Sequence, residues 1–322
     1  MRLMMGNHKT KSSLILFAAS LIWGMAFVSQ SKGMESMQPF TFNGVRSLMG
    51  AAALLVYMLV RSKVTGERFA KKVSSKASPK VILTGGVLCG LFLALASSLQ
   101  QVGILYTTVG KASFITTLYI IFVPMAGIFL RKKVDGIVWI GALVAAVGMY
   151  LLCMTESLQL GLGDILVFLC AIAFAGQILL VDAYAKAIDG PLLCCMELVV
   201  SGILCLIIAF LWENPQPEQI MNGMGSLLYA GVMSSGVAYT FQVIGQKGLH
   251  PSVAALIMSL ESVVATVSGW IAYRIGLLKT DQTLTPRQIA GCAIVFLAVL
   301  LVQLPEEWFP FHKEKADENK VA

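Results

Sequence analysis

Long apolar stretches separated by short polar segments dominate the chain. A helix needs about 20 apolar residues to cross the roughly 30 Å hydrocarbon core of a bilayer. The chain offers about ten such stretches, at 12–31, 40–60, 81–106, 112–130, 136–154, 164–184, 191–212, 224–245, 252–273 and 286–304. The first leads into the second without a small-residue cleavage site, so we expect a retained helix and not a signal peptide. The pattern predicts an all-α polytopic membrane protein.

Basic residues are distributed unevenly between the two sides of this predicted bundle. Of the 24 Lys and Arg residues, 18 fall on the side of the N-terminus, five fall on the opposite side, and Arg46 lies within a span. Because loops rich in Lys and Arg stay in the cytoplasm, both termini are expected inside. The basic loop 61–80 and the charged tail 305–322 are then cytoplasmic. We expect a multi-pass protein of the plasma membrane.

Composition removes several other classes of protein. The chain is 57% hydrophobic and 13% charged, with a mean hydropathy of +0.80, whereas soluble proteins are about 45–50% apolar and about 25% charged. The net charge of +7 comes from short loops between spans, so no nucleic-acid partner is expected. The seven cysteines form no C-x-x-C pair and the three histidines are isolated. We therefore expect no metal and no cofactor.

The two halves of the chain resemble each other. Residues 15–19 match residues 166–170, and at the same shift Arg46 in the second span falls on Glu197 in the seventh. We expect residues 1–154 and 155–304 to form two five-helix repeats. Since five is odd, the second repeat must enter the membrane inverted, which is a recurring plan of secondary transporters with a site near the midplane.

Several local motifs stand in an order that resembles one known family. Between the third and fourth spans lies QVGILYTTVGKASF, residues 101–114, which closes on Pro124, and the second half echoes it with VAALIMSLESV, residues 253–263. Trp23-Gly24 with Phe27, and Pro39 leading to Arg46, stand in the first two spans. Over residues 12–304 the chain resembles EamA-type permeases of the drug/metabolite transporter superfamily.

The resemblance implies a ten-helix secondary carrier, usually one that exports small metabolites or toxic compounds. Two places depart from the family pattern. Ser262 stands where members usually have proline, and residues 273–282 stand where a short Gly-Glu turn is common.

Charged residues inside spans are the first candidates for a solute pathway, because burying a charge in the bilayer is costly. Glu261 lies near the middle of the ninth span, Arg46 in the second and Glu197 in the seventh. A carboxyl that meets both aqueous sides in turn can carry a proton, and Glu261 is the first candidate for coupling, with Glu197 second. Arg46 is able to bind a solute carboxylate. The alternative for all three is a structural role between helices.

Neutral polar and aromatic residues complete the candidate pathway. Tyr239, Gln242 and Gln246 share one face of the eighth span by their spacing, and such a face can hydrogen-bond a solute or a neighbouring helix. Aromatic rings can stack on a solute, although near span ends they often anchor the interface. The full predicted pathway is Trp23, Arg46, Gln101, Tyr119, Glu197, Tyr239, Gln242, Gln246 and Glu261.

Secondary transport is the function that this sequence favours, with a small-molecule solute as partner, as a monomer or homodimer in the lipid bilayer. G-x-x-x-x-G-K-[ST], H-E-x-x-H and G-x-S-x-G are all missing from the sequence, so we expect neither an ATP-driven pump nor catalytic residues. The alternative is an intramembrane lipid- or prenyl-modifying enzyme, and a channel is a weaker one. Export or import, and proton coupling or exchange, stay open.

Overall fold

The computed structural model describes residues 2–65, 77–130, 134–153, 161–279 and 281–303. Throughout this part of the chain the secondary structure is helical, with no strand. Most of the predicted basic loop 61–80 and the whole tail 305–322 lie outside the described residues. The all-α polytopic fold is confirmed.

The described part of the first half contains six helices. They are α1 (Arg2–Gly33), α2 (Pro39–Thr65), α4 (Pro79–Ile104), α5 (Val109–Thr117), α6 (Tyr119–Phe129) and α7 (Gly136–Cys153). The second half contains α8 (Leu162–Ala185), α9 (Gly190–Trp212), α10 (Pro217–Asn222), α11 (Met224–Leu228), the π-helix η1 (Tyr229–Ala238), α12 (Tyr239–Gln246), α13 (Pro251–Met258), α14 (Glu261–Arg274) and α15 (Pro286–Gln303).

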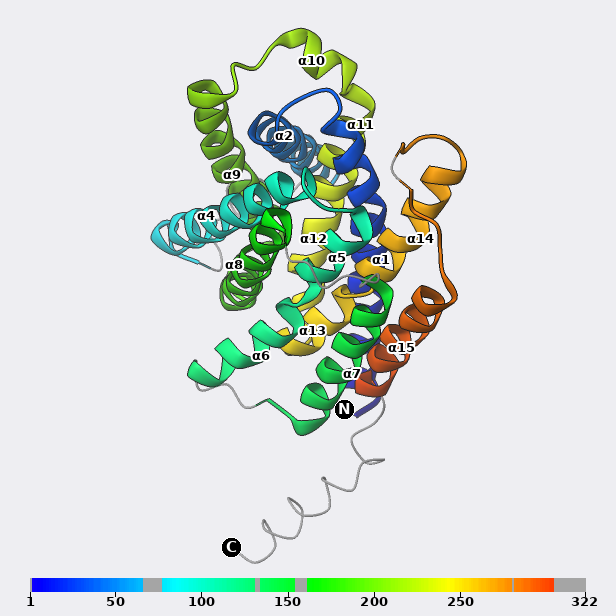
Figure 1. Cartoon of the computed structure of the whole chain (residues 1–322). Coiled ribbons are helices and arrows are strands. Elements are labelled where there is room, and N and C mark those ends of the chain that lie inside the picture. Colours follow the sequence, from blue (N-terminus) through cyan, green and yellow to red (C-terminus); the bar gives the residue numbers. More distant parts are fainter. Residues whose placement is uncertain (1, 66–76, 131–133, 154–160, 280, 304–322) are drawn as a thin grey trace, which may run out of the picture.

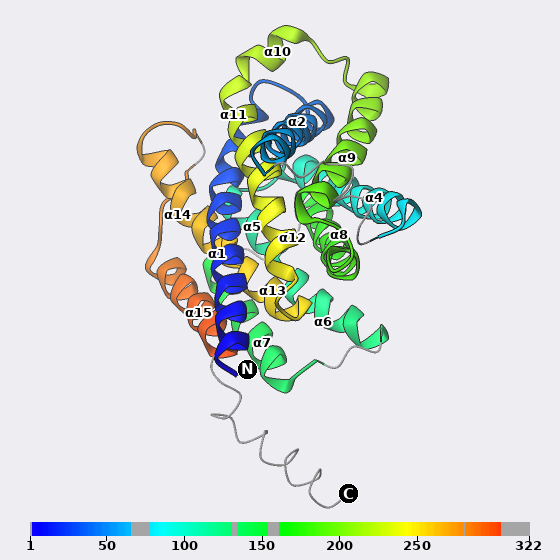
Figure 2. The same ribbon diagram turned by 180° about the vertical axis from the view of Figure 1, so that it is seen from behind.

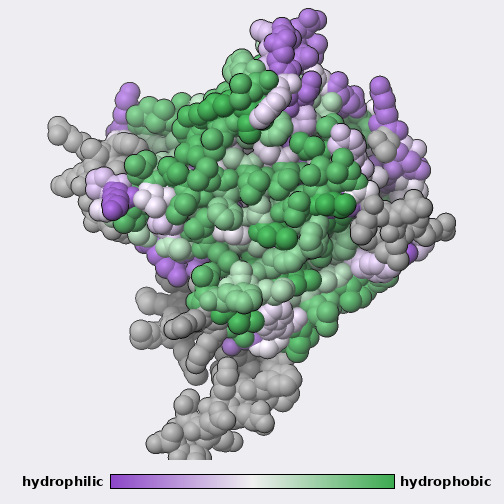
Figure 3. All heavy atoms as spheres, turned by 60° about the vertical axis from the view of Figure 1, so that its left-hand side comes forward, coloured by the Kyte–Doolittle hydropathy of each residue, from purple (hydrophilic) through white to green (hydrophobic). Residues whose placement is uncertain are grey.

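Each of the ten predicted spans coincides with one helix or one series of helices. Eight are long and apolar enough to cross a membrane, and Gly136–Leu151 and Pro286–Val302 are shorter apolar helices. Apolar side chains also cover the middle of the face in Figure 3, with polar residues toward its edges. This surface suits a lipid environment, in which only the ends of the helices meet water.

Three predicted spans are not single α-helices. The fourth is divided into α5 and α6, the eighth into α11, η1 and α12, and the ninth into α13 and α14. At the two α-helical junctions the backbone turns through i to i+3 bonds, from the Leu118 amide to the Ile115 carbonyl (3.2 Å) and from the Leu260 amide to the Ile257 carbonyl (3.3 Å). Such tighter turns redirect a helix axis without a loop. These three predicted spans are therefore each built from a series of consecutive helices.

Contacts between the halves follow a reciprocal scheme (Figures 1 and 2). Helix α4 packs on α8 and α9, while η1 packs on α1 and α2 and α12 packs on α1. Helices α5 and α6 pack on α8, while α13 and α14 pack on α1; α2 packs on α9 and α7 on α15. Every such contact of one half thus has a counterpart in the other, as an internal repeat requires.

Small residues allow some of these helices to approach closely. The spacing Gly86-x-x-x-Gly90 in α4 is typical of close helix contacts. A Cβ atom on Gly90 would lie 2.9 Å from the backbone oxygen of Glu197 in α9, which is too short for a side chain. Close packing at Gly90 therefore fixes the position of the Glu197 backbone along α4.

Candidate functional site

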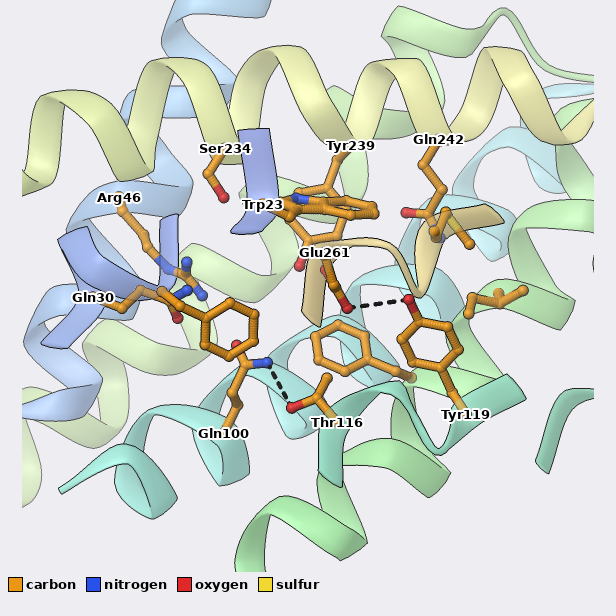
Figure 4. Close-up of a pocket in the computed structure, with 14 residues that line it drawn as sticks. Trp23, Gln30, Arg46, Gln100, Thr116, Tyr119, Ser234, Tyr239, Gln242 and Glu261 are labelled. Atoms are coloured by element: carbon orange, nitrogen blue, oxygen red, sulfur yellow. Dashed lines mark hydrogen bonds between the residues drawn. The ribbon is translucent and has the colours of Figure 1, made fainter. Parts of the chain in front are cut away.

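A central cavity lies where the two halves meet (Figure 4). Its cavity volume is about 40 Å³, well below the roughly 300–1,000 Å³ usual for small-molecule sites, so the cavity is narrow in this conformation. The lining combines aromatic, apolar and polar side chains from ten helical segments. The 14 residues are Trp23, Phe27, Gln30, Arg46, Gln100, Thr116, Tyr119, Phe174, Ile178, Ser234, Tyr239, Gln242, Met258 and Glu261.

The two broken helices place Tyr119 and Glu261 opposite each other. Each residue begins the helix that follows its junction, α6 for Tyr119 and α14 for Glu261. The Tyr119 hydroxyl donates a hydrogen bond of 3.1 Å to Oε1 of Glu261 (Figure 4). Glu261 is 5% exposed, so its carboxyl is shielded by protein and opens only toward the cavity. Of its two oxygens, Oε2 has no hydrogen-bond partner in the described part of the chain.

Arg46 supplies the cationic group of the cavity wall. Its side chain is 3% exposed, and its Nε donates a hydrogen bond of 2.8 Å to Oδ1 of Asn43. The Asn43 amide in turn donates to the Ser97 carbonyl at 2.9 Å. The guanidinium carbon also lies 5.7 Å from the centre of the Phe42 ring, within the range of a cation–π contact. These contacts hold the guanidinium in one orientation.

Glutamine side chains form a second polar chain that leads away from the cavity. Gln242 donates to Oε1 of Gln177 at 3.0 Å, and Gln177 donates to Oε2 of Glu197 at 3.2 Å. Glu197 is 0% exposed, and its other oxygen is buried without a hydrogen-bond partner in the described residues. On the first half, Gln100 instead donates to Thr116 at 3.1 Å.

Ten of the 14 lining residues are related in pairs by the internal repeat. Tyr119 and Glu261 are 142 positions apart, and the same shift relates two further pairs. The shift of 151 that relates Arg46 to Glu197 relates the other two. The five pairs are Tyr119 with Glu261, Gln100 with Gln242, Thr116 with Met258, Trp23 with Phe174, and Phe27 with Ile178.

The cavity is therefore lined largely by equivalent positions of the two halves, but the side chains at these positions differ in chemistry. Met258 lacks the hydroxyl that holds Gln100 at Thr116, so Gln242 turns to Gln177. Arg46 also lines the cavity, whereas its counterpart Glu197, which accepts a hydrogen bond from Gln177, does not.

Six of the nine predicted pathway residues line the cavity: Trp23, Arg46, Tyr119, Tyr239, Gln242 and Glu261. The rings of Trp23 and Tyr239 meet edge to face, with centroids 5.0 Å apart. The structure does not bring the other three to the cavity. Gln101 donates to the Gln30 carbonyl at 3.4 Å, Gln246 donates to the Ile178 carbonyl at 3.4 Å, and Glu197 is bound to Gln177.

The sequence analysis did not identify four polar lining residues: Gln30, Gln100, Thr116 and Ser234. Gln100 adjoins the predicted Gln101, and the shift of 142 from Gln242 identifies it. No comparable signal marks Gln30 or Ser234. Among the described residues, no group of three His, Cys, Asp or Glu side chains is placed to hold a metal ion.

Comparisons with known proteins agree with this architecture. The model of the EamA-like transporter family matches residues 10–154 and again 161–304. An uncharacterized transporter of Archaeoglobus fulgidus is 28% identical, over 93% of this chain and 88% of its own. The uncharacterized inner membrane transporter YedA of Escherichia coli K12 is 24% identical, over 92% and 91%.

A solved crystal structure shares the fold with a TM-score of 0.70 at 16% identity, covering 91% of this chain and 96% of its own. The double family match, the similar transporters and the helical bundle agree on one assignment, a multi-pass transporter of the plasma membrane. The chain belongs to the EamA-like transporter family.

Proposed function

We propose that the protein is a secondary carrier that exports a small solute by alternating access. One observation supports this most strongly: the cavity is lined by pairs of residues that the internal repeat relates. If residues 1–154 and 155–304 form two inverted repeats, each half can adopt the conformation of the other. The cavity then opens to opposite sides in turn, as in other carriers with inverted repeats.

Two polar clusters join helices at the outer end of the bundle, taking the N-terminus as cytoplasmic. Asp164 at the start of α8 accepts hydrogen bonds from Lys111 Nζ (2.6 Å) and Thr107 Oγ1 (3.1 Å). Glu213 at the end of α9 accepts from the backbone amides of Phe40 (2.8 Å) and Thr41 (2.6 Å). Charge-assisted hydrogen bonds are the stronger kind, so these two clusters are the contacts that must break for outward release.

At the inner end, a weaker contact joins α2 and α9. Arg61 in α2 lies 3.9 Å from Asp189 before α9, and both side chains are about one third exposed. Exposed pairs of this kind contribute little. The contrast fits a state that loads solute from the cytoplasm, and the proposed direction of export follows the family resemblance.

Glu261 is the group that would couple export to protons. It is the one carboxyl among the lining residues, and the break between α13 and α14 points it into the cavity (Figure 4). As the cavity alternates between the two aqueous sides, a proton taken up outside can be released inside. Exchange of one solute for another remains the competing mode of the same carrier.

Solute flux into sealed proteoliposomes tests the proposal. A carrier gives saturable uptake, and unlabelled solute on the far side accelerates it. Linear uptake without this acceleration would contradict the carrier and favour a channel. A chemically altered product would favour the lipid- or prenyl-modifying enzyme, which no observation on the described residues supports.

A further inference from the structure

Arg46 faces the cavity as a cation without an anionic partner. Its Nε is taken by Asn43, but the two terminal nitrogens make no hydrogen bond to any described residue. No carboxylate among those residues lies within 4.0 Å of the guanidinium. Figure 4 shows the group turned inward, toward the side of the cavity that carries Gln30 and Gln100. An arginine keeps its charge under all conditions, and burying that charge unpaired is costly.

Two further buried polar atoms beside it also lack partners. The Trp23 indole Nε1 is a donor and the Gln30 Oε1 an acceptor, and neither has a hydrogen-bond partner in the described residues. Both residues line the cavity. A buried polar atom left unpaired costs about 1–3 kcal/mol, so a bound molecule that satisfies these atoms gains affinity. A ligand that satisfies this part of the cavity would therefore carry a negative charge and an additional hydrogen-bond donor.

From these observations we infer that the transported solute carries a carboxylate that pairs with the terminal nitrogens of Arg46. The inference rests on the proposed carrier function and specifies its substrate class. The planar guanidinium fork matches a carboxylate, and Asn43, Ser97 and Phe42 hold that fork ready.

The charge of the lining favours a single negative charge. Arg46 is the one cation among the 14 lining residues and can neutralise one negative charge, so a phosphate dianion would stay half neutralised. The rest of the solute meets the rings of Trp23, Phe27, Phe174 and Tyr239. A monocarboxylate with an apolar or aromatic body fits this set.

The inference is tested by binding of matched probes to the full-length protein in lipid nanodiscs. The probes are a set of aromatic and aliphatic monocarboxylates, each with its amide and its amine, together with 2-phenylethyl phosphate. For at least one member of the set, the carboxylate should bind tenfold or more tightly than its amide, or about 1.4 kcal/mol. The phosphate should bind more weakly than 3-phenylpropionate.

Substitutions assign the effect to Arg46. Arg46→Gln should remove the preference for acid over amide, and Arg46→Lys should reduce it. Arg287→Gln is the matched control, since Arg287 is exposed at the start of α15, and it should keep the preference. If Arg46→Gln does not fold, the acid-to-amide ratio of the wild type decides.

Three outcomes would overturn the inference: no carboxylate binding more tightly than its amide, the phosphate binding more tightly than the carboxylate, or Arg46→Gln keeping the wild-type preference. The flux assay separates this failure from that of the proposed function. Saturable flux of a neutral or cationic solute would leave the carrier standing without the carboxylate. Carboxylate binding at Arg46 without any flux would leave the site standing without the carrier.

Discussion

Replacing Glu261 with glutamine should separate solute exchange from proton coupling. Glutamine has nearly the same volume and its Oε1 can still accept the hydrogen bond from Tyr119, so the pair that joins α6 to α14 is kept. Glutamine cannot take up or release a proton. Because Glu261 is the one carboxyl among the lining residues, the proposed coupling moves one proton for each solute exported.

This stoichiometry fixes the size of the effect. One proton moving down a gradient of one pH unit supplies about 1.4 kcal/mol, which is a tenfold concentration ratio. With the membrane potential clamped at zero, a wild-type carrier that exchanges one proton for each solute should therefore concentrate solute about tenfold in proteoliposomes. The Glu261→Gln protein should reach a ratio of one, while its exchange of labelled for unlabelled solute at equal pH stays close to wild type.

A matched control is available on the surface. Glu218→Gln makes the same chemical change on an exposed residue of α10 and should keep the tenfold accumulation. If Glu261→Gln concentrates solute in response to the pH gradient as the wild type does, Glu261 has a structural role and the coupling proposal is refuted.

Two further predictions concern the outer contacts and the packing of the cavity wall. Asp164→Asn weakens the contact with Lys111, so a cysteine introduced at Gln100 should react faster with an impermeant thiol reagent added outside. The expected increase is about tenfold, which corresponds to the loss of one charged hydrogen bond. An unchanged rate would argue against an outer gate at Asp164. A Cβ atom on Gly24 would overlap α14, so Gly24→Ala should lower the free energy of unfolding by about 1–3 kcal/mol, which is measured as a lower melting temperature. Gly136→Ala is the control, because Gly136 has open space around it, and it should leave the melting temperature unchanged.

The ten spans could be predicted because hydrophobic length alone determines which segments cross a bilayer. The breaks at Leu118 and Leu260 could not, since leucine favours helix and the tighter turns arise from packing in the assembled bundle. Their consequence, the meeting of Tyr119 and Glu261, was equally hidden.

The side of each helix that faces the cavity was the harder question. In an apolar helix, positions facing lipid and positions facing other helices have similar side chains, so Gln101 was selected where its neighbour Gln100 lines the cavity. Glu197 was correctly recognised as a buried charge, but its position depends on Gln177 in α8, which no sequence pattern singles out. Charge inside a span is visible in the sequence, whereas its partner is set by the tertiary structure.

The claim that the two halves alternate around the central cavity can be tested with one crosslink. The Thr107 hydroxyl and the Asp164 carboxylate are 3.1 Å apart, so cysteines at these two positions should form a disulfide that holds the outer end closed. Each single-cysteine protein under the same oxidant is the control for the native thiols. Solute exchange should stop when the double-cysteine protein is oxidised and return on reduction. Normal exchange by the fully crosslinked protein would contradict the claim.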